Sequence, residues 1–318
     1  MPPSFPSLKR NEQRGSKPRC HLLTHGSKQQ VAARLTALAA PYAYVAPTDH
    51  WMPEGFHNPE EAQLHQAQRL LPEYMRSELR YWWLVYISNT PNWDIVSTCT
   101  IEGVPGILLV EAKAHAQELM KETAGKKLDP AASANSKKNH GQIGWAIEDA
   151  NLGLAAETSL PWHLSIDHHY QMSNRFAWAW KLADIGCPVV LVYLGFIGAQ
   201  DMTEGSPLVN VAHWTQLVKD HSKPLVPEKV WNKRREIKYR PFIPLISNPQ
   251  PSTHQRANRM STDTTEKGIE TLIIRHMTSG DGLRYHQPAT SRVTRQGTRA
   301  NRDGPQQLKN IFPFFPTS

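Results

Sequence analysis

Two short, continuous apolar segments constrain the fold of this chain more than any other feature of its sequence. Residues 107–112 read ILLVEA and residues 188–196 read PVVLVYLGF. Runs of this length that are rich in Val, Ile and Leu are typical of strands buried on both faces. A sheet with such strands needs helices over both faces. The sequence therefore favours an α/β or α+β domain in which helices flank a mixed central sheet.

The folded region is predicted to span residues 25–248, which contain all 10 tryptophans of the chain. Residues 1–24 are rich in Pro, Lys and Arg and have no apolar periodicity, so we expect a disordered basic tail there. Residues 249–318 likewise read as a low-order tail, with a short helix expected at 264–277.

The net charge of +8 does not by itself indicate a nucleic-acid-binding core. Residues 1–30 hold six Lys or Arg and one acid, and residues 250–318 hold ten Lys or Arg and five acids. The two ends therefore carry all of the positive excess, and the middle of the chain is slightly acidic.

Helices are predicted between and before the strands. Ser27 is a capping residue for a helix that ends at Leu38, and Asn58-Pro59-Glu60-Glu61 has the composition of a helix start, so a second helix is expected to run to Leu71. The remaining predictions are helices at 72–81, 115–122, 142–153, 173–185 and 211–220, strands at 81–88 and 93–101, a loop at 126–139, and a proline-broken segment at 223–247 that wraps the core.

The segment from Trp93 to Lys113 is predicted to form a β-hairpin. If Glu102 and Gly103 are its two turn residues, Asp94 lies opposite Glu111 on the neighbouring strand. Opposed residues of an antiparallel pair project to one face, and Lys113, two residues after Glu111, projects to that face as well. Two carboxylates and one ammonium are therefore expected to meet at the end of this hairpin.

Such a trio has the chemistry needed to hydrolyse a phosphodiester. Two carboxylates bind a hard divalent cation such as Mg²⁺, with Mn²⁺ as a substitute. The bound cation polarises a phosphoryl group and activates water, and a lysine can orient that water or hold developing negative charge.

The pattern Asp94…Glu111-Ala112-Lys113 resembles the PD-(D/E)xK, or restriction endonuclease-like, nuclease superfamily over roughly residues 55–200. The chain departs from the motif in lacking a proline directly before Asp94. The resemblance implies a restriction endonuclease-like core and a Mg²⁺-dependent nuclease acting on DNA. Asp94, Glu111 and the backbone carbonyl of Ala112 would be metal ligands, and Lys113 would act on the water.

The same resemblance implies supporting roles for three further residues. Glu61 would be an additional acid on an upstream helix. Gln171 and Arg175, on the predicted helix that precedes the second buried strand, would support the site or the scissile phosphate. Residues 260–283 resemble the start of the motor subunit of type I restriction systems, which implies a bacterial restriction or defence system and its subunits as partners.

Other interpretations of these residues remain open. The trio can be a surface ion-pair cluster, and the fold can serve a non-catalytic nucleic-acid-binding or scaffold protein. RNA is an alternative substrate. Asp167-His168-His169 invites a transition-metal interpretation, although adjacent histidines on a regular element point apart.

The remaining features concern cysteine pairing, membrane association and cellular location. The three cysteines, Cys20, Cys99 and Cys187, are far apart and form no CxxC pair, so neither a disulfide framework nor a zinc knuckle is expected. No apolar run reaches the length of a membrane span, and the first residues of the sequence contain no apolar stretch for a signal peptide. We therefore expect a cytoplasmic protein that has no membrane partner. A homodimer is a separate expectation.

Overall fold

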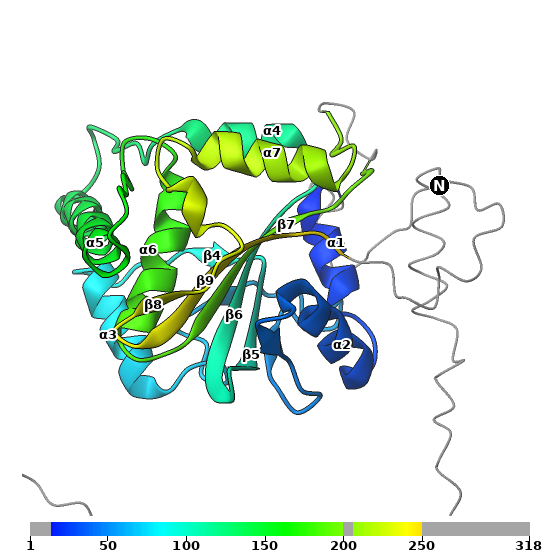
Figure 1. Ribbon diagram of the computed structural model, residues 1–318. Coiled ribbons are helices and arrows are strands. Elements are labelled where there is room, and N and C mark those ends of the chain that lie inside the picture. Colours follow the sequence, from blue (N-terminus) through cyan, green and yellow to red (C-terminus); the bar gives the residue numbers. More distant parts are fainter. Residues whose placement is uncertain (1–13, 200–205, 250–318) are drawn as a thin grey trace, which may run out of the picture. The chain divides into compact units, whose positions relative to one another are not determined.

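The computed structural model describes residues 14–199 and 206–249, and its centre is a curled mixed sheet (Figure 1). In this part of the chain the sheet has seven strands, in the order β1-β5-β6-β7-β9-β8, with β2 also paired to β5. The strands are β1 (Ala43–Tyr44), β2 (Trp51–Met52), β5 (Ile95–Ile101), β6 (Val104–Lys113), β7 (Val189–Gly195), β8 (Arg235–Ile237) and β9 (Arg240–Ser247). The predicted α/β class with a mixed central sheet is confirmed.

The hairpin of β5 and β6 has the register that the sequence predicts. Ile101 pairs with Val104, and the ladder continues without a bulge to the pair Ile95 and Val110. The turn residues Glu102 and Gly103 both have positive φ values, 51° and 79°. Positive φ at both positions is the requirement of the turn that fits strand twist best, so local turn geometry sets the register.

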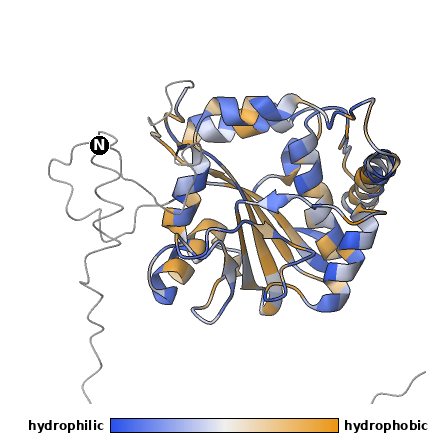
Figure 2. Ribbon diagram, turned by 180° about the vertical axis from the view of Figure 1, so that it is seen from behind, coloured by the Kyte–Doolittle hydropathy of each residue, from blue (hydrophilic) through white to orange (hydrophobic). Residues whose placement is uncertain are grey.

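Helices cover both faces of the sheet, and their apolar sides face it (Figure 2). On one face lie α3 (Glu73–Trp83), α5 (Ala134–Thr158), α6 (Tyr170–Asp184) and α7 (Val211–Ser222). On the other lie α1 (Ser16–Leu23) and α2 (Lys28–Ala39). The strands β6, β7 and β9 are parallel to one another and are buried between these layers.

The short elements are β3 (Ala62–Gln63), β4 (Asn92–Trp93), α4 (Ala116–Met120), η2 (Lys121–Thr123) and η3 (Glu228–Val230).

Several predicted helices are confirmed. The side chain of Ser27 caps α2 by accepting a hydrogen bond from the amide of Gln30, and α2 buries Val31, Leu35 and Leu38. The predicted helices at 72–81, 115–122, 173–185 and 211–220 correspond to α3, α4 with η2, α6 and α7. All three cysteines, Cys20, Cys99 and Cys187, are unpaired and buried.

The predicted helix from Asn58 to Leu71 is wrong. Ala62 and Gln63 form β3, which pairs with Trp93 and Asn92 of β4. Ala62 and Leu64 are fully buried, so burial in this segment follows the period of a strand rather than that of a helix. Glu61 therefore precedes a strand and is not on an upstream helix.

The predicted strand at 81–88 is also wrong. Helix α3 continues to Trp83 because Met75, Leu79, Trp82 and Trp83 recur at helical spacing and are all buried. The chain after α3 is held by Asn139, whose side-chain oxygen accepts hydrogen bonds from the amides of residues 85 and 86.

Glycine does not end the predicted helix at 142–153, because α5 runs through Gly153 to Thr158. A Cβ atom at Gly153 would meet the ring of Trp180 at 2.3 Å. The glycine thus allows α5 and α6 to pack closely. The predicted loop at 126–139 is shorter than expected, since α5 begins at Ala134.

One predicted boundary of the folded region and the predicted role of one segment differ from the structure. Residues Ser16–Leu23 form α1, and Cys20 and Leu23 are buried in the core, so the folded part starts before residue 25. The segment 223–247 does more than wrap the core, because it supplies β8 and β9. Residues 1–13 and 250–318, with the expected helix at 264–277, lie outside the described residues.

No helix in the described part of the chain combines the length and the apolar character that a membrane crossing requires.

Candidate active site

The end of β6 places two charged side chains on one face of the sheet. Leu109, Glu111 and Lys113 alternate with Val110 and Ala112, and Leu109 belongs to the core beneath α6. Glu111 and Lys113 therefore project toward α6, while Ala112 packs on the side of α1 and α2. Glu111 is 1% exposed and Lys113 is 6% exposed, so both charges are buried.

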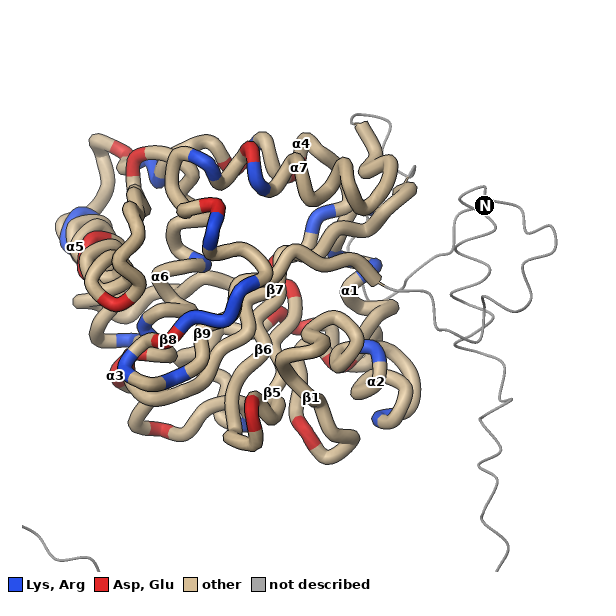
Figure 3. The backbone as a smooth tube through the Cα atoms, in the orientation of Figure 1, with Lys and Arg blue, Asp and Glu red and all other residues tan. Residues whose placement is uncertain are grey.

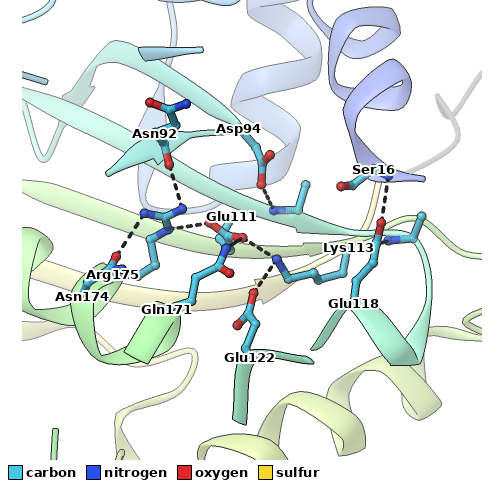
Figure 4. Close-up of polar contacts among 12 residues, drawn as sticks. Ser16, Asn92, Asp94, Glu111, Lys113, Glu118, Glu122, Gln171, Asn174 and Arg175 are labelled. Carbon is cyan, nitrogen blue, oxygen red and sulfur yellow. Dashed lines mark hydrogen bonds and ion pairs between the residues drawn. The ribbon is translucent and has the colours of Figure 1, made fainter. Parts of the chain in front are cut away.

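Both carboxylate oxygens of Glu111 accept hydrogen bonds (Figure 4). Oε1 accepts from Nζ of Lys113 and, at 2.6 Å, from Nε2 of Gln171. Oε2 accepts from Nε of Arg175. Gln171 and Arg175 are one turn apart on α6, so this helix presents both donors to the same carboxylate.

Arg175 is fixed by three further contacts. Its guanidinium donates to the carbonyl oxygen of Asn92 at 2.7 Å and to the side-chain oxygen of Asn174 at 3.0 Å. It also lies over the ring of Trp93, 4.5 Å from the ring centroid. Arg175 therefore joins α6 to β4, the strand directly before Asp94.

Asp94 lies at the bend between β4 and β5. Its Oδ2 accepts a hydrogen bond from the amide of Ala112 at 2.7 Å, so this side chain closes the hairpin ladder beyond Ile95. Burial, and next the negative charge of Glu111, raise the pKa of Asp94 to about 8. The two carboxylates predicted to lie together are therefore electrostatic neighbours.

Glu122 is a site residue that the sequence analysis missed. Its Oε1 forms a buried ion pair with Nζ of Lys113 at 2.5 Å, and its Oε2 lies 3.9 Å from Nε2 of His221 on α7. The sequence did contain a signal, because Ala116, Leu119 and Glu122 follow one another at helical spacing and the first two are buried. An acid that continues a buried stripe needs a partner.

The buried network contains more acids than bases. Asp94, Glu111 and Glu122 are carboxylates. Lys113 and Arg175 are the cations that pair with Glu111 and Glu122, and the charge of Lys113 also acts on Asp94. Burial favours neutral Glu111, but Arg175 and Lys113 hold its pKa below the usual value. Burial raises the pKa of Glu122 to about 7, against the lowering effect of Lys113. Three carboxylates and two cations leave one negative charge, which a shared proton can neutralise near pH 7.

The same imbalance is compatible with a divalent cation. Asp94 accepts one described hydrogen bond, so its other oxygen can serve as a ligand, and Glu111 and the carbonyl of Ala112 are its neighbours. Within the described residues, no group of three or more His, Cys, Asp or Glu side chains could hold a metal ion by itself. A cation here would thus depend on two carboxylates, a carbonyl and water, the kind of ligand set that Mg²⁺ accepts.

Glu61 borders this network without joining it. Its oxygens contact Nζ of Lys17 and the side-chain amide of Asn92, each at 3.2 Å. Its charge adds to the effects that raise the pKa of Asp94, after burial and Glu111. Glu61 and Asn92 also line a surface cleft of about 710 Å³ between α1 and the segment 50–70.

The histidines at 168 and 169 do not converge on one point. Their rings are nearly perpendicular, with an interplanar angle of 86° and centroids 5.6 Å apart. His169 instead packs against His221, with ring centroids 4.6 Å apart. Burial, with His169 and Lys113, lowers the pKa of His221 to about 4, so His221 is neutral at pH 7. This arrangement does not favour the transition-metal interpretation.

Comparison of the chain with protein-family models, curated proteins and solved structures finds no match. The case for a function therefore rests on the residues of this site.

Proposed function

We propose that this chain is a Mg²⁺-dependent nuclease of the PD-(D/E)xK type that hydrolyses phosphodiester bonds of DNA. One observation carries the proposal. Asp94, Glu111 and Lys113 gather in a buried network with an excess carboxylate, at the ends of adjacent strands. Burying such a network costs desolvation free energy, and apolar residues of similar volume would stabilise the fold equally well.

The residues divide into two groups by their chemistry. Asp94, Glu111 and the carbonyl of Ala112 would hold Mg²⁺ or Mn²⁺, which when bound polarises a phosphoryl group and lowers the pKa of water. Lys113 is an ammonium with two carboxylate partners, so Glu122 keeps it in place and charged even when its contact with Glu111 is weakened. It can donate to the attacking water or to a phosphoryl oxygen.

Gln171 and Arg175 orient Glu111. Their hydrogen bonds fix both carboxylate oxygens, and fixed groups lose little freedom when a substrate arrives. Glu61 pairs with Lys17 and Asn92 outside the Glu111 network, so it would be an additional acid beside the site and not one of the principal metal ligands. A place in a bacterial restriction or defence system follows only from the resemblance of residues 260–283, which lie outside the described part.

One observation favours the alternative of a non-catalytic protein. Glu111 already has Lys113, Gln171 and Arg175 as donors, so its charge is neutralised without a metal. A scaffold that keeps a nuclease-like arrangement would show the same contacts but no dependence on cations.

Cleavage and metal binding by two variants distinguish these functions. Glu111→Gln keeps the side-chain shape and removes charge, so both Mg²⁺ binding and cleavage of single- and double-stranded DNA should be lost. Lys113→Ala should bind Mn²⁺ or Mg²⁺ at least as well as the parent, because a cation is removed beside the site. Its cleavage rate should still fall about a hundredfold or more.

The matched control is Glu102→Gln, an acid at the tip of the same hairpin that pairs with Arg234 on the surface. This variant should cut and bind metal as the parent does. If the parent cuts no DNA with any divalent cation, the non-catalytic function is the better one. If both site variants cut at the parental rate, the nuclease centre is elsewhere.

A further inference from the structure

Three lysines lie along the segment that leads from η2 to the first turn of α5. Lys126 and Lys127 follow η2, and Lys137 lies in the first turn of α5. Nε2 of His140 donates a hydrogen bond to the carbonyl oxygen of Lys126 at 2.8 Å. Residues three apart share a helix face, so Lys137 lies on the same side of α5 as His140. Lys126, Lys127 and Lys137 are called the lysine cluster below.

Backbone contacts tie Lys126 to the start of α6, beside the site. The amide of Lys126 donates to the carbonyl oxygen of Ile166 at 2.8 Å. The amide of Tyr170 donates to the carbonyl oxygen of Ala124 at 3.2 Å. Nζ of Lys126 lies 4.9 Å from the centroid of the Tyr170 ring. The next residue, Gln171, donates to Glu111. The ammonium of Lys126 is therefore held beside the helix turn that contacts the central carboxylate.

Lys126 is unlike the other partly buried lysines in having no carboxylate partner among the described residues. Lys113 pairs with Glu111 and Glu122, and Lys181 pairs with Glu78 and Asp184. Burial lowers the pKa of Lys126, and no described acid counteracts this effect. A half-buried cation that rests on an aromatic ring is well placed to bind an anion from outside the protein.

The anion that fits is a phosphate of the nucleic-acid backbone. Between Lys126 and Lys137 the only acid in the sequence is Asp129, whose side chain accepts a hydrogen bond from the amide of Ala131 at 2.8 Å. Residues 126–137 thus carry a net charge of +2. We propose that Lys126, supported by Lys127 and by Lys137 of the first turn of α5, binds a backbone phosphate of the DNA strand whose neighbouring phosphodiester enters the candidate active site.

This inference rests on the proposed function for the identity of the ligand, but it concerns binding rather than cleavage. The test measures the affinity of the full chain for a fluorescently labelled DNA oligonucleotide, single- or double-stranded, by anisotropy in EDTA over a series of salt concentrations. Lys126→Ala should weaken binding about tenfold. The slope of log affinity against log salt should become shallower by about 0.9 on duplex and about 0.7 on single strands, the values for one lost phosphate contact. Lys126→Arg keeps the charge and should bind as the parent does.

The matched control is Lys238→Ala, which removes one lysine that is 60% exposed and pairs with Asp184. It should leave both affinity and salt slope unchanged, and thermal melting checks that all variants are folded. The inference is overturned if Lys126→Ala binds DNA like the parent or like Lys238→Ala, if the parent binds no DNA, or if it prefers RNA of the same sequence.

Cleavage assays on the same proteins separate this inference from the proposed function. If the parent binds DNA through Lys126 but never cuts it, the lysine cluster stands and the nuclease proposal fails. If the parent cuts DNA and Lys126→Ala leaves binding intact, the nuclease proposal stands and the cluster has no role in binding.

Discussion

Strands β6 and β7 are neighbours of similar burial, and they end in opposite ways. The two strands pair in parallel, so that Glu111 of β6 lies beside Tyr193 of β7 and Lys113 lies beside Gly195. All seven residues of β7 are buried and none is charged, whereas β6 ends in two buried charges. Figure 3 shows other charged residues on helices α3, α5 and α7 and around the edge strand β8. Apolar residues can thus complete a strand at this depth, so the charges of β6 are an added cost that packing does not require.

Breaking the charged network of β6 should give the largest loss of stability. Arg175→Met leaves one oxygen of Glu111 without its cation and frees the carbonyl of Asn92. The free energy of unfolding should fall by about 3–5 kcal/mol, the usual cost of removing one partner of a buried ion pair. Urea denaturation measures it.

Arg234→Met is the control for this change, because Arg234 pairs with Glu102 and Glu236 on the surface. It should cost less than about 1 kcal/mol. Equal losses in the two variants would contradict the special status of the buried network.

The apolar strand should respond through packing alone. Leu191→Ala creates a cavity in fully buried β7 and should destabilise the protein by about 3 kcal/mol. Below its melting temperature the folded variant should retain the metal affinity of the parent, as calorimetry can show, because no charge of the site has changed. Loss of metal binding in a folded Leu191→Ala protein would mean that the two strand ends are not independent.

The charge excess of the network predicts a pH dependence of stability in metal-free protein. Asp94 has a pKa near 8 in the folded state and near its ordinary acidic value when unfolded. Its raised pKa stabilises the fold in acid, and this contribution is lost as pH rises toward 8. Histidines with lowered pKa values, such as His221, have the opposite effect between about pH 4 and 6.5.

The difference between Asp94→Asn and the parent isolates the carboxylate. In EDTA, the variant should become more stable relative to the parent as pH rises from 5 to 8, measured by denaturation at each pH. A difference that stays constant across this window would show that Asp94 is ionised throughout.

The smallest expected effect concerns Glu122, which contacts Lys113 but would not touch the metal. Glu122→Gln should lower cleavage about tenfold through kcat, with metal affinity unchanged, because Lys113 loses one of its two anchors. Glu122→Asp, which keeps the charge, should recover part of the rate. Equal cleavage rates for Glu122→Gln and Glu122→Asp would show that the charge of Glu122 is not needed and would assign this residue a packing role.

Much of the site on β6 could be predicted because it follows from local rules. Turn residues that accept positive φ fixed the hairpin register, and strand alternation placed Glu111 and Lys113 on one face. The predicted helix at 58–71 failed because its capping signal was local, while the pairing of Ala62 with Trp93 joins distant segments. Strand β9 was not predicted because its two prolines suggested a broken segment, and the pairing of β9 likewise joins distant parts of the chain. Pro244 lies beyond Phe242, where the ladder with the short strand β8 ends, whereas Pro241 lies opposite Glu236 within that ladder.

The sequence by itself determined the class of fold, the hairpin and the shared face of two charged side chains, because these depend on turn chemistry and on the two-residue period of a strand. The resemblance named Gln171 and Arg175 as supports of the site, but only the tertiary structure decided which atoms they contact, and it added Glu122. Arg175, Gln171 and Glu122 come from other elements, and their contacts depend on how α6 and η2 pack against β6. The energies of these contacts depend on burial, which arises only when distant segments of the chain meet.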